Sequence, residues 1–228
     1  MSSRLEEKER RRQERLAQEQ QEARTRARLR RVQLTLGGLV VVVAIVGIVF
    51  AITSSGDGPK KKPEATVPIP KAKITNLTAA AHAAGCVVRS FPSQGRTHVT
   101  GKVKYKTNPP TSGPHNPVWA EDGIYAPGQT PGKEHYTHSL EHGRIEIQYR
   151  PGTPKRRILQ LETLFNEEVN GSRGYHQLLF QNNTNMPYAV AATAWTRLLG
   201  CPKWNNGIFD AIRDFRQSFL DKGPEFIP

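Results

Sequence analysis

The residues His138, Glu141 and His142 have the types and the spacing of a metal site. They form the pattern H-x-x-E-H, which Gly143 follows directly. Positions i, i+3 and i+4 of a helical turn point the same way, so we expect both imidazoles and the carboxylate to share one face. Such a set suits Zn²⁺, with Glu141 as the general base if the protein is an enzyme.

Histidine is concentrated in this part of the chain, because six of the seven lie between residues 82 and 142. Proteins bind Zn²⁺ or Cu²⁺ with three or four N/O ligands. We therefore expect a Zn or Cu ion, and no organic cofactor, at the ligands His98, His115, His138 and His142. In the alternative, His98 and His115 hold a loop by hydrogen bonds and Glu141 accepts backbone N–H bonds.

The order H-x-x-E-H also matches the inverzincin metalloproteases, which set it in a long helix. Here Gly143 would end the helix, and a predicted strand follows at once, which argues against a protease. The sequence has no G-x-S-x-G elbow, P-loop or G-x-G-x-x-G fingerprint, so it does not support a serine hydrolase, NTPase or dinucleotide-binding protein. We interpret Glu146 as an exposed strand carboxylate and Met186 as a packing residue rather than a copper ligand.

A proline loop at residues 107–119, T-N-P-P-T-S-G-P-H-N-P-V-W, is the other unusual segment. Its four prolines exclude a helix interior and a central strand. A stiff loop in a small domain usually presents side chains, which here are Ser112, His115 and Trp119. Ser112 fits turn chemistry better than the role of a nucleophile.

The fold class predicted for residues 78–228 is α+β, with a small antiparallel sheet and two or three helices. Apolar and polar residues alternate at 99–105 and 145–149, and 176–181 and 188–195 are shorter strand candidates. Helical stripes of apolar residues predict helices from Pro154 to about residue 169 and at 206–220.

The N-terminal third predicts a membrane anchor. The chain has 228 residues, a formal net charge of +13 and room for one domain plus appendages. Residues 1–31 predict a charged cytoplasmic helix, 32–52 an uncharged transmembrane helix, and 53–77 a Pro/Lys-rich linker. Five arginines at 24–31 place the N-terminus in the cytoplasm by the positive-inside rule and the C-terminal domain outside the plasma membrane. The expected partners are the lipid bilayer and another membrane or envelope protein. Nucleic acid is excluded because the basic run lacks interleaved aromatics.

Cys86 and Cys201 are the only cysteines, and both belong to the domain predicted to lie outside the membrane. An even pair in an oxidising compartment predicts a disulfide. The alternative, a nucleophilic or copper-binding thiol, has neither a C-x-x-C pattern nor a Cys–His spacing to support it.

Three segments resemble the bacterial domain-of-unknown-function family 3105. They are P-P-T-S-G-P-H-N-P-V-W-A-E-D-G-I-Y at 109–125, H-S-L-E-H-G-R-I-E-I-Q-Y at 138–149 and A-A-T-A-W-T-R-L-L-G-C at 191–201. The resemblance implies a single-pass, outward-facing actinobacterial membrane protein, with His115, His138, Glu141 and His142 on motif positions. It implies no settled activity.

Three functions remain open from the sequence. The first is a binding module that holds copper or zinc for structure, storage or delivery. The second is a metal-dependent hydrolase that uses Glu141 on a metal-bound water. The third is a metal-free cell-envelope interaction module with a surface formed by Trp119 and Tyr125.

Overall fold

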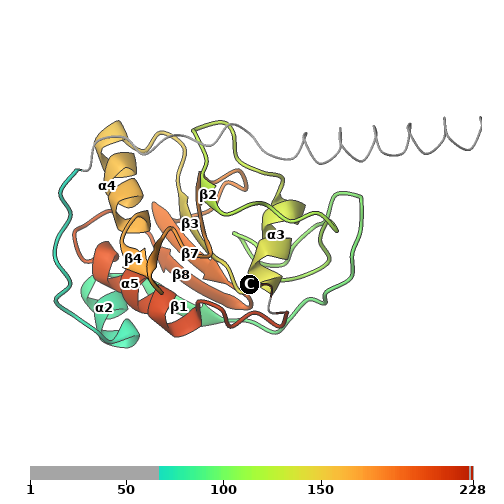
Figure 1. The fold of residues 1–228 in the computed structure, drawn as a ribbon, viewed down its shortest axis with the longest axis horizontal. Coiled ribbons are helices and arrows are strands. Elements are labelled where there is room, and N and C mark those ends of the chain that lie inside the picture. Colours follow the sequence, from blue (N-terminus) through green and yellow to red (C-terminus); the bar gives the residue numbers. More distant parts are fainter. Residues whose placement is uncertain (1–66, 226, 228) are drawn as a thin grey trace, which may run out of the picture. The chain divides into compact units, whose positions relative to one another are not determined.

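A six-stranded mixed sheet lies at the centre of the part of the chain that the computed structural model describes, residues 67–225 and 227 (Figure 1). The strand order is β1-β8-β7-β3-β6-β2, and β4 and β5 form a separate hairpin. The strands are β1 (Val87–Ser90), β2 (Gly123–Ile124), β3 (Ile145–Tyr149), β4 (Glu168–Val169), β5 (Ser172–Arg173), β6 (Gln177–Gln181), β7 (Val190–Ala194) and β8 (Arg197–Cys201). The helices described are α2 (Leu77–Ala83), α3 (Lys133–Glu141), α4 (Lys155–Phe165) and α5 (Ile208–Phe219). The α+β class is confirmed.

The prediction of a purely antiparallel sheet is wrong. β1, β8, β7 and β3 pair antiparallel, but β6 runs parallel to both β3 and β2. The chain between β3 and β6 contains α4, and parallel neighbours need such a long crossover. Alternation of apolar and polar residues predicts a strand but carries no information on its direction.

Most predicted elements of the domain are present, and one is not. The strands at 145–149 and 176–181 and both helices are confirmed, whereas 188–195 is only the first half of the β7–β8 hairpin. Residues 99–105 do not form a strand. They keep alternating half-buried side chains, but the backbone N–H groups of Val103 and Lys106 donate to the side chains of Glu134 and Gln94 instead of to a neighbouring strand.

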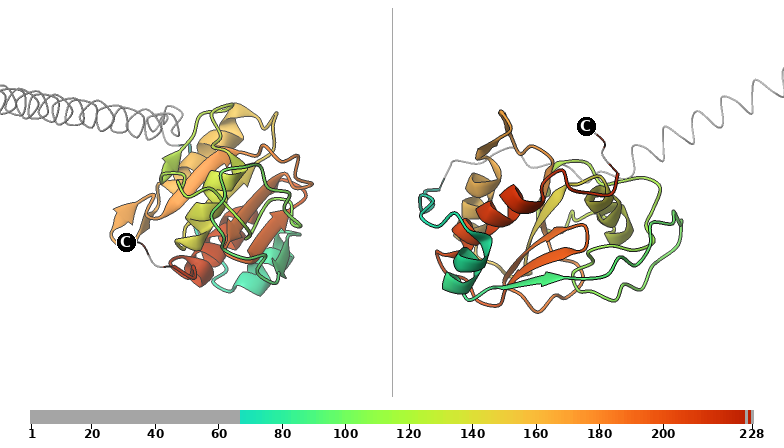
Figure 2. Two further views of the ribbon diagram at one scale, coloured as in Figure 1. Left: turned by 90° about the vertical axis from the view of Figure 1, so that its right-hand side faces the viewer. Right: turned by 90° about the horizontal axis from the view of Figure 1, so that it is seen from below.

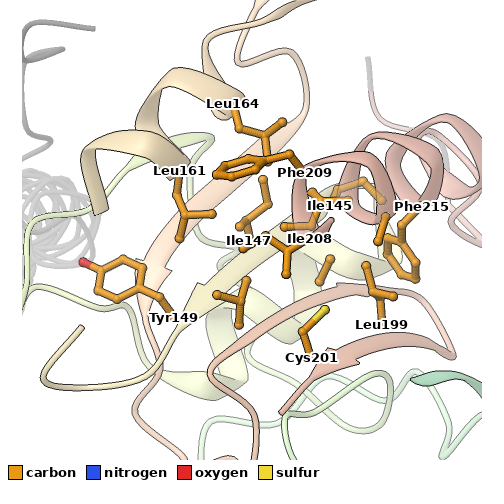
Figure 3. Packing of buried hydrophobic residues seen from close by; sticks show 14 of the residues in the cluster. Ile145, Ile147, Tyr149, Leu161, Leu164, Leu199, Cys201, Ile208, Phe209 and Phe215 are labelled. Atoms are coloured by element: carbon orange, nitrogen blue, oxygen red, sulfur yellow. The ribbon is translucent and has the colours of Figure 1, made fainter. Parts of the chain in front are cut away.

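The two faces of the sheet bury different side chains. Ile145, Ile147 and Tyr149 point from β3 into an apolar core with side chains of α4 and α5, such as Leu164 and Phe209 (Figure 3). α2 adds its alanines to the same core. α3 lies on the opposite side of the sheet (Figure 1), where its residue Tyr136 packs with residues of β6. The helices α2, α4 and α5 therefore supply the core, which leaves α3 to carry other side chains.

Residues 67–76, which we call the strap, lie in extended form against α4 and α5. The Thr163 hydroxyl donates to the carbonyl of Val67, and Ile69 and Ile74 pack against the apolar core. Asp210 accepts the backbone N–H groups of Lys73 and Ile74. The strap is thus fixed to α5 by an aspartate on the first turn of that helix.

No helix among residues 67–225 and 227 is both long and apolar enough to cross a bilayer. The predicted cytoplasmic helix at 1–31 and the predicted membrane span at 32–52 lie outside the described residues. Both stay predictions.

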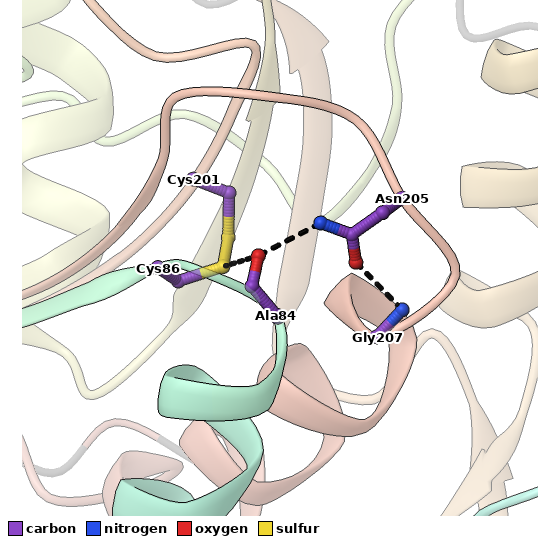
Figure 4. The surroundings of a disulfide bond; sticks show 5 residues. All are labelled: Ala84, Cys86, Cys201, Asn205 and Gly207. Atoms are coloured by element: carbon purple, nitrogen blue, oxygen red, sulfur yellow. Dashed lines mark hydrogen bonds between the residues drawn. A yellow bond between two sulfur atoms is a disulfide. The ribbon is translucent and has the colours of Figure 1, made fainter.

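Cys86 and Cys201 form the predicted disulfide, which joins the start of β1 to the end of β8 across 115 positions of sequence (Figure 4). Nearby, Asn205 donates to the carbonyl of Ala84 and accepts the N–H of Gly207 at the start of α5. The bond therefore lies where α2, the sheet edge and α5 meet.

Replacing both cysteines, Cys86→Ser with Cys201→Ser, should lower the free energy of unfolding by up to roughly 4 kcal/mol, because the unfolded chain loses a long closed loop. Urea unfolding of the oxidised wild type and the double variant measures the loss. Reductant should destabilise the wild type and leave the variant unchanged. Equal stability of the oxidised wild type and the variant would contradict this expectation.

Candidate metal centre

The C-terminal end of the proline loop and Ala120, which follows it, are bound to α3. The backbone N–H of Asn116 donates to the carbonyl of Glu134, 3.1 Å away, and the Ser139 hydroxyl donates to the carbonyl of Ala120, 2.7 Å away. In return the N–H of Ala120 donates to the Ser139 hydroxyl and to the carbonyl of His135. The loop segments around residues 100–120, green in Figure 2, run alongside α3 as a result.

Three imidazoles bond to carbonyls of this loop through their Nδ1 atoms, two from α3 and one from the loop itself. His115 Nδ1 lies 2.8 Å from the carbonyl of Gly113, and His138 Nδ1 lies 2.6 Å from that of Asn116. His135 makes the same bond to the loop, at Val118. A carbonyl oxygen can only accept, so Nδ1 must carry the proton in each ring. With the proton on Nδ1, the lone pair of a neutral imidazole lies on Nε2, as in metal-binding histidines.

His98 is brought to the same place by an isolated parallel β-bridge with His115. The N–H of Val99 donates to the carbonyl of His115, and the N–H of His115 donates to that of Thr97. The ring centroid of His98 lies 4.9 Å from that of His138 and 5.1 Å from that of His115. The sequence predicts a strand at 99–105. In the described residues around it, this single bridge is the only β pairing.

The four side chains that gather are His98, His115, His138 and Glu141. Their ligand atoms all lie within 4.8 Å of one another. A tetrahedral Zn²⁺ site with bonds of about 2.0–2.1 Å needs donor atoms about 3.3 Å apart, so small side-chain rotations would close the set around an ion. His115, His138 and Glu141 are buried and His98 is exposed, so His98 is the member of the group that faces solvent.

Glu141 faces two basic groups. Its Oε2 lies 2.8 Å from Nε2 of His115, and its Oε1 lies 3.5 Å from Nε of the half-exposed Arg96. The contact with His115 is not in line for an N–H···O bond, and His115 Nε2 has no hydrogen-bond partner although it is fully buried. With Nδ1 donating to Gly113, a neutral His115 ring directs the lone pair of Nε2 at a carboxylate oxygen. Only a cation or a second proton makes that contact favourable.

Burial keeps His138 neutral. It lowers the pKa of His138 to about 4, against the bond to the Asn116 carbonyl, which acts the other way, and the rings of His142, His115 and His98 add smaller lowerings. The pKa of His142 is also lowered to about 4, first by burial and then by Arg144. Both rings are therefore unprotonated at neutral pH, as a metal ligand must be.

His142 is near this group but not part of it. α3 ends at Glu141, and Gly143 follows with a φ of +82°, as its position predicted. The His142 ring packs against Trp119 and His138, with ring centroids 5.1 and 4.4 Å apart. The structure thus brings together His138 and Glu141 of the H-x-x-E-H pattern. Glu141 is a member of the ligand group together with the histidines.

Two interpretations of single residues can now be compared with the structure. Ser112 is buried and accepts the N–H of Gln94, so it fixes the loop as turn chemistry suggested. Glu146 is not an exposed strand carboxylate but is fully buried, and it accepts bonds from Thr193 and Gln148. Alternate side chains of β3 point away from the apolar core, and α3 covers that face of the sheet. Glu146 therefore lies under α3 rather than in solvent.

The two residues of the predicted interaction surface, Trp119 and Tyr125, differ in their exposure. Trp119 is 41% exposed and its ring lies over His138 and His142, whereas Tyr125 is buried against Phe180. Arg96 and Trp195, which contact Glu141 and the ring of His115, were not expected at the site. Nothing local in the sequence marks them, because the fold brings them from distant positions.

The comparisons with known proteins give a family and no further relative. The family model described as "Protein of unknown function (DUF3105)" matches residues 98–226. That range contains all four members of the ligand group. No curated protein and no solved structure matches the chain.

Burial raises the pKa of Glu146 well above its usual value of 4.5, despite bonds from Thr193 and Gln148 that act the other way. The folded state then keeps a proton that the unfolded state releases, so stability falls as the pH rises above the unfolded pKa. Glu146→Gln removes this dependence. We expect the difference in unfolding free energy, variant minus wild type, to increase between about pH 4 and about pH 7. A difference that is the same at both pH values would show that this carboxyl group is ionised in the folded protein.

Proposed function

We propose that this chain, which belongs to the DUF3105 family of proteins of unknown function, binds one divalent transition-metal ion through His98, His115, His138 and Glu141. The ion is Zn²⁺ or Cu²⁺. Its role in the proposal is binding, for structure, storage or delivery, rather than hydrolysis.

The observation that carries the proposal is the contact between His115 and Glu141. The Nδ1–H of His115 is committed to the carbonyl of Gly113, and its buried Nε2 points without a hydrogen bond at a carboxylate oxygen 2.8 Å away. An ion bound by both atoms would satisfy both at once. His138 supports this reading, because the bond to Asn116 leaves its Nε2 free in the same way.

The donor set favours a borderline ion. Three imidazole nitrogens and one carboxylate oxygen suit Zn²⁺ and Cu²⁺, whereas Ca²⁺ and Mg²⁺ prefer oxygen ligands. Cu⁺ is a poorer match because it selects thiolate and thioether ligands. Both cysteines are held in the disulfide, and Met186 is buried with Ala191 and Leu198.

The position of Glu141 separates binding from hydrolysis. A catalytic zinc site keeps one coordination position for water, and a nearby base activates that water. Glu141, the expected base, belongs to the ligand group, so four protein donors would close a tetrahedral shell. The exposed His98 then provides the side from which an ion enters and leaves.

The proposed location is the outer side of the plasma membrane. The disulfide supports an oxidising compartment, and the uncharged segment at 32–52 with arginines before it supports a single span with the N-terminus inside. A site anchored there would meet ions that pass through the cell envelope. The exposed Trp119 beside it would meet a membrane or envelope partner.

Exchanging single histidines tests the ligand set. In the full chain, purified in detergent without a histidine tag, we expect about one equivalent of Zn²⁺ or Cu²⁺ by elemental analysis after loading and desalting. His115→Ala and His138→Ala should each abolish stoichiometric binding. His142→Ala should keep it, and so should the control His82→Ala, which removes an exposed histidine of α2 outside the group. Full occupancy in the His115 and His138 variants would refute the site.

Glu141→Gln distinguishes a ligand from a general base. An amide oxygen is neutral and a weaker donor than a carboxylate, so we expect metal affinity to fall by at least 10–100-fold, the loss typical even of groups outside the ligand shell. Competition with a chelator of known affinity measures it. Unchanged affinity together with a hydrolytic activity lost in this variant would support the metal-dependent hydrolase instead.

A further inference from the structure

Residues 221–225, which we call the clamp, close the end of α3 that carries Glu141 (Figure 1). An α-helix leaves its last four carbonyls without partners inside the helix. In α3 the residues directly after the helix satisfy the first three of these carbonyls. The fourth, that of Glu141, accepts the N–H of Glu225 instead, 3.1 Å away. A proposed metal ligand is thus the last residue of a helix that a distant segment completes.

Two glycines allow the clamp to lie directly on the helix end. A β-carbon on Gly223 would overlap the carbonyl of Glu141 and the N–H of Gly143. A β-carbon on Gly143 would lie 2.8 Å from Cα of Asp221, closer than carbon atoms pack. The N–H of Asp221 also donates to the carbonyl of Gly143, 2.9 Å away. The φ of Gly223 lies outside the left-handed region, so its missing side chain serves this close approach alone.

Side chains outside the ligand group hold the clamp in place. Nδ1 of the buried His176 donates to Oδ1 of Asp221, 2.6 Å away. The guanidinium group of Arg144 donates to the carbonyl of Ile227, just beyond the clamp. Asp221 has a φ of +58°, which a residue other than glycine keeps where its surroundings fix it. A segment near the end of a chain is ordered when it is tied down in this way.

We infer that the clamp sets the metal affinity of the proposed centre by holding Glu141 in the ligand group. The inference rests on the proposed function and adds a point of regulation to that site. Glu141 is the last residue of α3, where a helix frays first, and its carboxylate must stay against His115 to act as a donor. Displacing the clamp frees this turn, the carboxylate leaves the group, and the ion is released.

Gly223→Ala tests the close approach, with Gly101→Ala as the matched control. A β-carbon on Gly101 meets no atom within 4 Å, and its φ also lies outside the left-handed region. In the full chain we expect Gly223→Ala to lower the Zn²⁺ affinity by at least about tenfold, measured by competition with a chelator, and the control to leave it unchanged. Hydrogen exchange of the metal-free proteins should be faster in the last turn of α3 for Gly223→Ala alone. Unchanged affinity, or unchanged exchange of that turn, would overturn the inference.

Two substitutions of Glu225 decide the question if Gly223→Ala does not fold. Glu225→Pro removes the N–H that the carbonyl of Glu141 accepts, whereas Glu225→Ala removes the side chain and keeps that N–H. We expect the proline variant to bind Zn²⁺ at least about tenfold more weakly than the alanine variant. Equal affinities would show that the backbone bond has no part in metal binding.

A double-variant cycle separates positioning of Glu141 from a general loss of stability. If the clamp acts through Glu141, the clamp substitution should lower the Zn²⁺ affinity of a Glu141→Gln background by less than about twofold. Equal losses in the two backgrounds would refute action through Glu141. A wild type that takes up no Zn²⁺ would refute the proposed function and the inference with it. A wild type that binds Zn²⁺, together with a clamp variant of the same affinity, would refute the inference alone.

Discussion

The bonds between imidazole Nδ1 atoms and backbone carbonyls of the proline loop are the constraint on which the site depends. They do two things at once. The Nδ1 atoms of His138 and His135 fasten α3 to the loop at Asn116 and Val118, Nδ1 of His115 bonds within the loop to Gly113, and each bond places a proton on that side of the ring. When these rings are neutral their lone pair is on Nε2, and Nε2 of His115 lies 2.8 Å from Glu141. A loop rich in proline suits this task, since its carbonyls lose little entropy when they are held in place.

The rest of the fold can be understood as support for that contact. The apolar core lies on the face of the sheet covered by α2, α4 and α5, so α3 on the other face does not have to supply it. The disulfide joins α2 and β1 to β8 at the end of the sheet away from the loop. Under α3, the buried side chains of Glu146, Gln148 and Thr193 bond to one another. The apolar core and the residues of the site therefore lie on different faces of one sheet.

Local patterns predicted the elements and the region of the site, but not the pairing of strands or the ligand geometry. The stripes of α4 and α5 and the alternation of β3 report burial on one side, which is why these elements were found. Residues 99–105 show the same alternation in burial, yet the N–H of Val103 bonds to the side chain of Glu134 rather than to a neighbouring strand. The H-x-x-E-H spacing predicted that His142 would join the group, but its ring packs against His138 and Trp119 outside the ligand set. Arg96 and Gly223 gain their surroundings only from the folded chain, so no spacing rule reveals them.

The most direct measurement is X-ray absorption at the metal edge of the full chain loaded with one equivalent of Zn²⁺. The proposed site predicts four N/O donors at about 2.0–2.1 Å, with the outer-shell scattering of three imidazole rings. The Glu141 carboxylate supplies the fourth donor. A six-coordinate shell of oxygen atoms without imidazole scattering would contradict the account, and the histidines would then serve only to hold the loop on α3.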